Sequence, residues 1–116
     1  MATIKSYTDI EQAKKLAEIL PLESADMYYT KDSIENYYCP IPLIGKYSAI
    51  HDQIPCWSLA ALLNALLYAL PSATLDSSSD HHFRIHCMER DTEWYDNAVD
   101  ACVEMILKLN NLKLLQ

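Results

Sequence analysis

Glycine is almost absent from this sequence of 116 residues, which contains only Gly45. Phosphate-cradling loops and dinucleotide-binding turns need several glycines, because their backbone must approach the ligand closely. Neither pattern occurs, so these two classes of nucleotide site are excluded. Without glycine, turns must use Asp, Asn and Ser, and we expect loops at Asp32, at Asn36 and at 76–80.

Positively charged residues are also few, with nine Lys and Arg against sixteen Asp and Glu, for a net charge of −7. Affinity for nucleic acid comes mainly from clustered Lys and Arg that contact phosphates. The scattered basic residues therefore argue against a nucleic-acid partner. DNA mimicry is poorly supported as well, because the most acidic stretch, 89–100, is interrupted by Arg90, Trp94 and Tyr95.

Long apolar runs are missing too. No run reaches about 18 residues, so no transmembrane span and no membrane partner are predicted. The first residues, MATIKSYTDIEQ, lack the apolar core of a secretory signal, and we expect a cytoplasmic protein. The cysteines form no CxxC pair that would indicate a zinc or redox motif. We expect four free thiols, buried as small apolar side chains: Cys39, Cys56, Cys87 and Cys102.

The most apolar stretch is 59–70, LAALLNALLYAL, in which only Asn64 and Tyr68 have a polar group. A helix here is about 18 Å long, too short to cross a bilayer, so its apolar sides must be buried in a globular core. Ser58 is placed to cap its first turn, and Pro71 ends it. The leucines that we expect to be mostly buried are Leu62, Leu63 and Leu66.

Two further helices are predicted on either side. The first begins with TDIE, a capping box in which Thr8 and Glu11 satisfy each other's backbone amides, and it is expected to end at Pro21. The last helix is expected from the N-cap Asn97 to about Leu112. Its predicted buried side consists of Ala98, Cys102, Met105, Ile106, Leu109 and Leu112.

Two short strands, 25–30 and 34–39, are predicted between the first two helices, and Pro40 and Pro42 confine the next segment to an edge or a loop. The segment 81–88, HHFRIHCM, alternates apolar and polar residues and predicts a further strand. A four-residue loop at 89–92 would return the chain beside it. This register puts Trp94 on the core face. The expected pairs are Met88 with Glu93, Cys87 with Trp94, and His86 with Tyr95.

The elements therefore come in the order helix, strand, strand, helix, strand, strand, helix. Antiparallel strands with segregated helices are typical of the α+β class. We predict one small domain over 1–116, with antiparallel strands and a buried central helix.

Three segments also resemble a group of known sequences: PLESADMYY, PCWSLAALL, and the C-terminal NAVDACVEMILKLNNLKLL after the hairpin. Their combination is similar to small uncharacterised proteins found in gut-bacterial genomes and their phages or mobile elements. The resemblance covers nearly the whole chain. It implies a cytoplasmic protein of mobile-element origin and assigns no activity and no functional residue.

The outward side of the predicted strand is a candidate anion-binding strip, because arginine offers a planar donor fork and histidines become donors as the pH falls. The alternative is a solvated sheet face. The strip consists of His82, Arg84, His86 and Tyr95.

Metal and catalytic sites find little support. His82 and His86 would lie about 13 Å apart along the strand, too far to share one zinc ion. Cys56 or Cys87 with His51 or His86 has the residue types of a nucleophile and its base, but no spacing supports the pairing. We predict no metal and no cofactor.

Tyrosines and terminal leucines form the candidate interaction surface. Tyrosine is enriched in the cores of protein interfaces. Its ring can equally well pack at the edge of a small hydrophobic core, with the hydroxyl in water. The tyrosines are Tyr28, Tyr29, Tyr37, Tyr38 and Tyr47, and the leucines are Leu112, Leu114 and Leu115.

The sequence thus favours a non-enzymatic protein-interaction module that binds another protein or forms a homodimer. The alternative is a protein that binds or hydrolyses an anionic small molecule on the strip.

Overall fold

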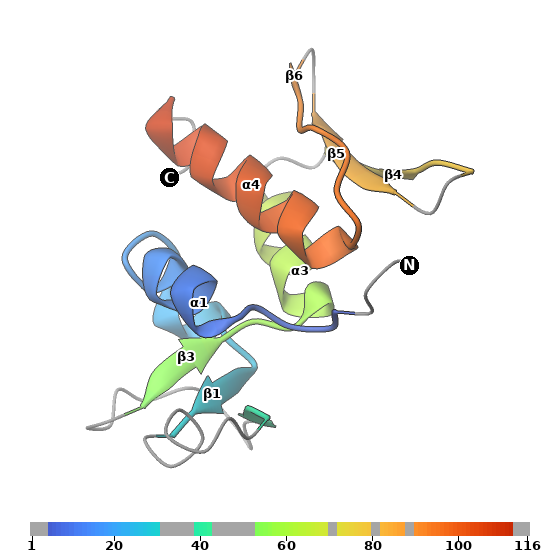
Figure 1. The fold of residues 1–116 in the computed structure, drawn as a ribbon. Helices are drawn as coiled ribbons and strands as arrows, with labels where there is room; N and C mark the ends of the chain where they lie inside the picture. Colours follow the sequence, from blue (N-terminus) through green and yellow to red (C-terminus); the bar gives the residue numbers. More distant parts are fainter. Residues whose placement is uncertain are drawn as a thin grey trace.

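Helices and two small antiparallel sheets make up the fold, which confirms the predicted α+β class (Figure 1). The computed structural model describes residues 5–30, 39–42, 53–69, 72–79, 82–87 and 90–112. In chain order the elements are α1 (Ile10–Ala17), a short 3-10 helix (Leu22–Ser24), β1 (Met27–Tyr29), β2 (Ile41–Pro42), β3 (Ile54–Cys56), α3 (Leu59–Ala69), β4 (Thr74–Ser77), β5 (Phe83–Cys87), β6 (Arg90–Asp91) and α4 (Ala98–Asn111).

The two sheets lie on opposite sides of the helices (Figure 1). The first has the strand order β2-β1-β3, and α1 packs on β3; the second has the order β4-β5-β6, and α4 packs against β5. The helix α3 lies behind α4 and packs against it. Among the described residues the predicted order of elements is roughly right, with β3 in the first sheet and β4 in the second as strands that were not predicted.

The additional strands have local explanations. β3 is the tripeptide Ile54–Cys56, too short to show a period, and its Pro55 is tolerated because β3 is an edge strand. β2 also contains a proline and forms the other edge, as Pro42 predicted. β4 occupies Thr74–Ser77, where a loop was expected from residue 76 onwards. Most of the predicted strand 34–39 lies outside the described residues.

The first helix is capped one residue later than predicted. The Asp9 side chain accepts a hydrogen bond from the Gln12 amide (2.8 Å), and the Gln12 side chain accepts one from the Asp9 amide (3.1 Å). The segment TDIEQ contains two overlapping capping boxes, Thr8 to Glu11 and Asp9 to Gln12. Burial decides between them, because Thr8 is fully buried and hydrogen-bonded to Trp57. The helix ends at Ala17, before Pro21.

The central helix α3 is buried on one side and open on the other. Ser58 caps it as predicted, since its Oγ accepts a hydrogen bond from the Ala61 amide (3.2 Å). Leu62 and Leu66 expose 0% and 1% of their surface, whereas Leu67 exposes 41% and Tyr68 91%; Leu63 is only partly buried. A segment that is apolar all round cannot show which side faces the core. Among the described residues, no helix is both long enough and apolar enough to span a membrane.

The predicted hairpin register is wrong. Two residues, 88 and 89, connect Cys87 to Arg90, and Tyr95 forms a bridge with Phe83 rather than with His86. This offset of three residues is odd, so it turns Trp94 away from the core. The turn comes earlier than predicted, so the pairs Cys87 with Arg90 and His86 with Asp91 are four residues off. Thr92 then changes this offset from four to three, because its Oγ1 accepts the hydrogen bond of the Ile85 amide (2.9 Å) in place of a backbone carbonyl. One extra residue thus enters between Asp91 and Tyr95, as in a β-bulge.

Two groups of buried residues hold the fold together. We call the larger group the helical core. It contains residues of α3 and α4, together with Leu16, Leu20, Ala25, Trp57 and Ile85. The smaller, the sheet cluster, consists of Ala13, Tyr29 and Cys56. Cys56 and Cys102 are buried free thiols as predicted, but Cys39 is exposed, which corrects the prediction for this cysteine. The side chain of Cys87 lies outside the described residues.

Candidate functional site

The predicted basic strip lies on β5, where alternation separates inward from outward side chains. Ile85 is fully buried, whereas Arg84 and both histidines are partly exposed. Each basic group faces a carboxylate. Arg84 Nε lies 3.3 Å from Asp76 Oδ2, and His86 Nδ1 is hydrogen-bonded to Asp91. His82 Nε2 lies 3.3 Å from Asp96 Oδ1.

These carboxylates neutralise the strip. Arg84 also approaches Asp91, with Nη1 3.6 Å from Oδ2. The hydrogen bond from His86, together with the charge of Arg84, lowers the pKa of Asp91 and keeps it ionised. An anionic ligand would have to displace or oppose three carboxylates, which weighs against anion binding here. Within the described part of the chain, no group of three His, Cys, Asp or Glu side chains is placed to hold a metal ion.

Tyr95 and Trp94 exchange their predicted faces. Tyr95 pairs with Phe83 through two backbone hydrogen bonds of 2.7 Å and packs partly against the helical core, so it does not belong to the strip. Trp94 exposes 44% of its surface instead of joining the core. The Arg84 guanidinium carbon lies 4.6 Å from the centre of the Trp94 ring, within the range of a cation–π contact.

The tyrosine surface is only partly described. Tyr29 is buried in the sheet cluster, and its hydroxyl donates a hydrogen bond to the Thr8 carbonyl (2.6 Å). Tyr29 is therefore a core residue, which corrects its assignment to the interaction surface. Tyr28 is partly buried, and Leu112 is exposed, so its assignment to the buried side of the last helix is wrong. The remaining predicted residues of this surface lie outside the described residues: Tyr37, Tyr38, Tyr47, Leu114 and Leu115.

Neither buried cysteine is suited to nucleophilic catalysis. Burial raises the pKa of Cys56 above its ordinary value, and the hydrogen bonds with Thr8 and Tyr29 only partly oppose this. Burial raises the pKa of Cys102 to about 12. Because the thiolate is the reactive form, these raised pKa values disfavour nucleophilic attack by either side chain.

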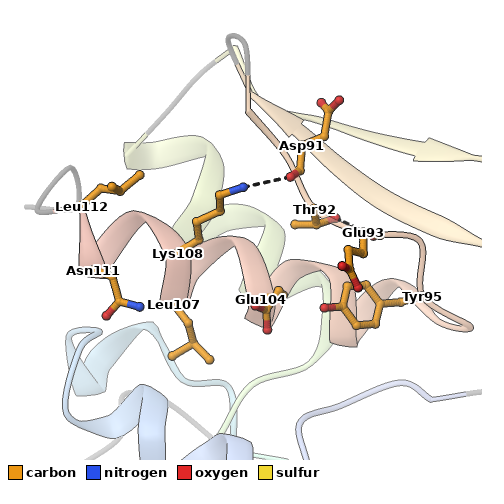
Figure 2. A pocket seen from close by; sticks show the side chains of 9 residues that line it. All are labelled: Asp91, Thr92, Glu93, Tyr95, Glu104, Leu107, Lys108, Asn111 and Leu112. Atoms are coloured by element: carbon orange, nitrogen blue, oxygen red, sulfur yellow. Dashed lines mark hydrogen bonds between the residues drawn. The ribbon is translucent and has the colours of Figure 1, made fainter.

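A hollow that the sequence did not reveal lies between the segment 91–95 and α4, and we call it the α4 groove (Figure 2). Its volume is about 590 Å³. One wall is a single face of α4, formed by residues at positions i, i+3, i+4, i+7 and i+8 from Glu104. The lining residues are Asp91, Thr92, Glu93, Tyr95, Glu104, Leu107, Lys108, Asn111 and Leu112.

Hydrogen bonds fix both walls of the groove. Thr92 is buried, and its amide donates to the Ile85 carbonyl (3.0 Å), which holds the segment 91–95 against β5. Lys108 Nζ donates to the backbone carbonyl of Asp91 (3.1 Å) and ties α4 to this segment (Figure 2). The groove is therefore formed by two elements that are bonded to one another.

The electrostatic character of the groove is acidic. Burial raises the pKa of Tyr95, and the negative charges of Glu104, Glu93 and Asp100 raise it further. The Tyr95 hydroxyl points towards Glu104 (Figure 2). Within the described part of the chain, the Glu93 and Glu104 side chains take part in no ion pair.

A second hollow of about 420 Å³ adjoins the groove, with Tyr95 lining both. The Trp94 side chain lines this hollow as well. At its other side Lys5 Nζ lies 2.7 Å from Asp100 Oδ1. Burial alone would raise the pKa of Asp100, but hydrogen bonds from Lys5, Gln12 and Asn97 outweigh burial and lower it. This cluster anchors the N-terminal segment to α4.

Comparisons with protein-family models, with curated proteins and with solved structures find no match to this chain. The resemblance to small proteins of gut bacteria and their mobile elements therefore stays an expectation. The groove was missed because its walls meet only in the correct hairpin register. The available signal was the spacing of Glu104, Lys108 and Leu112 along one helix face.

Proposed function

We propose that this protein works by binding another protein through the α4 groove, and not by catalysing a reaction. The observation that supports the proposal is the exposure of large apolar side chains beside a preformed hollow. Leu112 lines the groove and exposes 48% of its surface, and Trp94 exposes 44% in the adjoining hollow. Tryptophan is enriched among the residues that dominate binding energy at protein interfaces.

The alternative of an anionic small-molecule ligand has less support. Its predicted strip faces Asp76, Asp91 and Asp96, and its tyrosine lies on the opposite face of the strand. Phosphate or a carboxylic acid bound there would stabilise the fold by mass action. A thermal-shift screen with inorganic phosphate and small carboxylic acids tests this alternative directly, and we expect no stabilisation.

Self-association through the groove is one form of the proposal, and the predicted homodimer needs its own test. Sedimentation of the purified protein at micromolar concentrations measures it. If the groove joins two copies, Leu112→Ser weakens the dimer, whereas Leu67→Ser does not. Leu67 is the matched control, because it is a leucine of similar exposure on α3. A dimer that responds equally to both substitutions would place the contact elsewhere.

A partner other than a second copy is tested by site-specific photo-crosslinking in the source cells. A photoreactive residue at Leu112 should give a discrete protein adduct, and the same residue at Leu22 should not. Leu22 is the control because it is exposed but does not line the groove. The adduct should disappear when Trp94→Ser is added. If neither a dimer nor a groove-dependent adduct is found, the protein-interaction proposal is wrong.

A further inference from the structure

We propose that the α4 groove binds a basic segment of another protein, with arginine or lysine side chains paired to Glu93 and Glu104 and an apolar side chain seated beside Leu112. This inference rests on the proposed function and specifies the partner of the same site. The argument uses the length of the groove, the charges on its walls and the position of its apolar end.

The helical wall sets the length of the bound segment. From Glu104 to Leu112 the face of α4 extends for about 12 Å at 1.5 Å per residue. An extended peptide advances about 3.3 Å per residue, so about four residues fit along this wall. A segment this short gains affinity only if most of its side chains make contacts. The chemistry of the walls therefore restricts the sequence of the partner.

The walls favour a cationic occupant. Glu93 and Glu104 bring two carboxylates to the groove, against the single ammonium group of Lys108. The Asp91 carboxylate points away from the groove (Figure 2) and pairs with His86 and Arg84. Lys108 already donates to the Asp91 carbonyl, so it is engaged within the protein. Glu93 and Glu104 are exposed and take part in no ion pair among the described residues, so they are available to an incoming cation. Arginine matches a carboxylate with two parallel donors.

The net charge of the whole chain also favours a cationic partner. A net charge of −7 attracts a basic partner from a distance and repels nucleic acids, acidic proteins and a second copy. At the groove, the negative charges of Glu93 and Glu104 already raise the pKa of Tyr95. Complementary charge therefore favours a basic segment over the homodimer as the occupant.

The apolar end distinguishes a peptide from a simple polycation. Leu112 lies one helical turn beyond Lys108 and is exposed, and Leu107 packs partly against the helical core. Burying an apolar side chain of the partner against Leu112 is favourable, because the apolar surfaces of both side chains are removed from water. A polyamine has charge but no such side chain. We therefore expect binding to need both kinds of contact.

The probe is a capped peptide of about four residues that contains both arginine and leucine. Its binding is followed by heteronuclear NMR at low and high salt. Shifts should be confined to residues 91–95 and 104–112, and affinity should fall as salt rises. The double variant Glu93→Gln, Glu104→Gln should bind about fivefold more weakly. Leu112→Ser should weaken the peptide but not the polyamine spermine.

The matched control is Glu11→Gln with Glu23→Gln, which makes the same charge change at exposed sites outside the groove. If both double variants weaken peptide binding equally, the peptide is attracted by the net charge of the protein and not by the groove, and the proposal is overturned. Equal binding of a glutamate–leucine peptide, of spermine or of a second copy would also overturn it. If the basic peptide fails while Leu112 still gives a groove-dependent adduct, the interaction function stands with a different partner. If both fail, both proposals are wrong.

Discussion

The helical core and the sheet cluster are stabilised in different ways. The helical core joins leucine, isoleucine, valine and methionine side chains of α3, α4 and β5, and apolar contact is its main source of stability. Among the described residues the sheet cluster has three buried members, Ala13, Tyr29 and Cys56, and both Tyr29 and Cys56 are hydrogen-bonded to Thr8. The smaller group of buried residues therefore relies on hydrogen bonds as well as on apolar contact.

Thr8 and Trp57 connect the two regions. Trp57 belongs to the helical core, yet its amide donates to Thr8 Oγ1 (3.2 Å), and its carbonyl accepts from the Thr8 amide (2.9 Å). Its indole Nε1 donates to Ser24 Oγ (2.9 Å). The Ser58 amide next to it donates to Asp26 (2.9 Å). These hydrogen bonds, of which the one from the Trp57 amide to Thr8 is buried, position the start of α3 on the first sheet.

The largest effect is expected in the helical core. Leu62→Ala should lower the free energy of unfolding by about 2–5 kcal/mol, because it leaves a cavity between α3 and α4. Leu67→Ala on the same helix is the control and should cost at most about 0.5 kcal/mol. Chemical denaturation of both variants makes the measurement. Equal losses would mean that α3 is buried on a different side.

A smaller effect is expected at the sheet cluster. Thr8→Val keeps the shape of the side chain but removes the acceptor of the Trp57 amide, which should cost about 1–3 kcal/mol. Thr74→Val is the matched control, because Thr74 is exposed and its hydroxyl contacts are long, at 3.4 and 3.5 Å. If Thr8→Val unfolds at the same denaturant concentration as the wild type, the sheet cluster does not depend on its polar contacts.

This contrast explains what the sequence could predict. Periodicity and caps located the helices, because Ser58, Asn97 and the apolar positions act within a few residues. In the first sheet β1 lies within a predicted strand, but β3 was not predicted, since the bonds of Thr8 to Trp57 and of Ser58 to Asp26 join residues far apart in sequence. No local pattern records them.

The candidate site was harder to predict for a related reason. Alternation along β5 correctly separated Ile85 from Arg84, but it did not determine which residues pair with this strand. The Thr92 hydroxyl changed that pairing by replacing a backbone acceptor. The changed register placed Trp94 on the outer face and brought the segment 91–95 against α4. The position of the turn and the one-residue bulge at Thr92 together therefore set the segment that faces α4.

A pH-dependent contact joins the N-terminal segment to α4. The ionised form of Asp100 is stabilised in the folded protein, because Lys5, Gln12 and Asn97 donate to it and its pKa is lowered. Its contribution is complete above the ordinary Asp pKa of about 4 and is lost as the pH falls through the lowered folded value. Asp100→Asn should therefore destabilise the protein by about 1 kcal/mol at neutral pH. The difference from the wild type should shrink below about pH 4.

Denaturation of both proteins at several pH values measures this difference. Lys5→Met is a companion variant that removes one donor and leaves the carboxylate in place. It should destabilise at neutral pH and weaken the pH dependence without abolishing it, because the other two donors remain. A difference between Asp100→Asn and the wild type that stays constant across the pH range would exclude the charge of Asp100 as the cause.

The smallest effect is expected on the outer face of the second sheet, where the polar contacts are more open to water than those of the buried Thr8. Arg84 stacks on Trp94 and pairs with Asp76. A double-mutant cycle with Arg84→Met and Trp94→Leu should give a coupling of about 0.5 kcal/mol, since water competes for the guanidinium. The cycle of Arg84→Met with Asp76→Asn should be similarly small and should fall further at high salt. A coupling above the Thr8→Val loss would contradict the view that burial, and not the number of polar contacts, makes the Thr8 hydrogen bonds important.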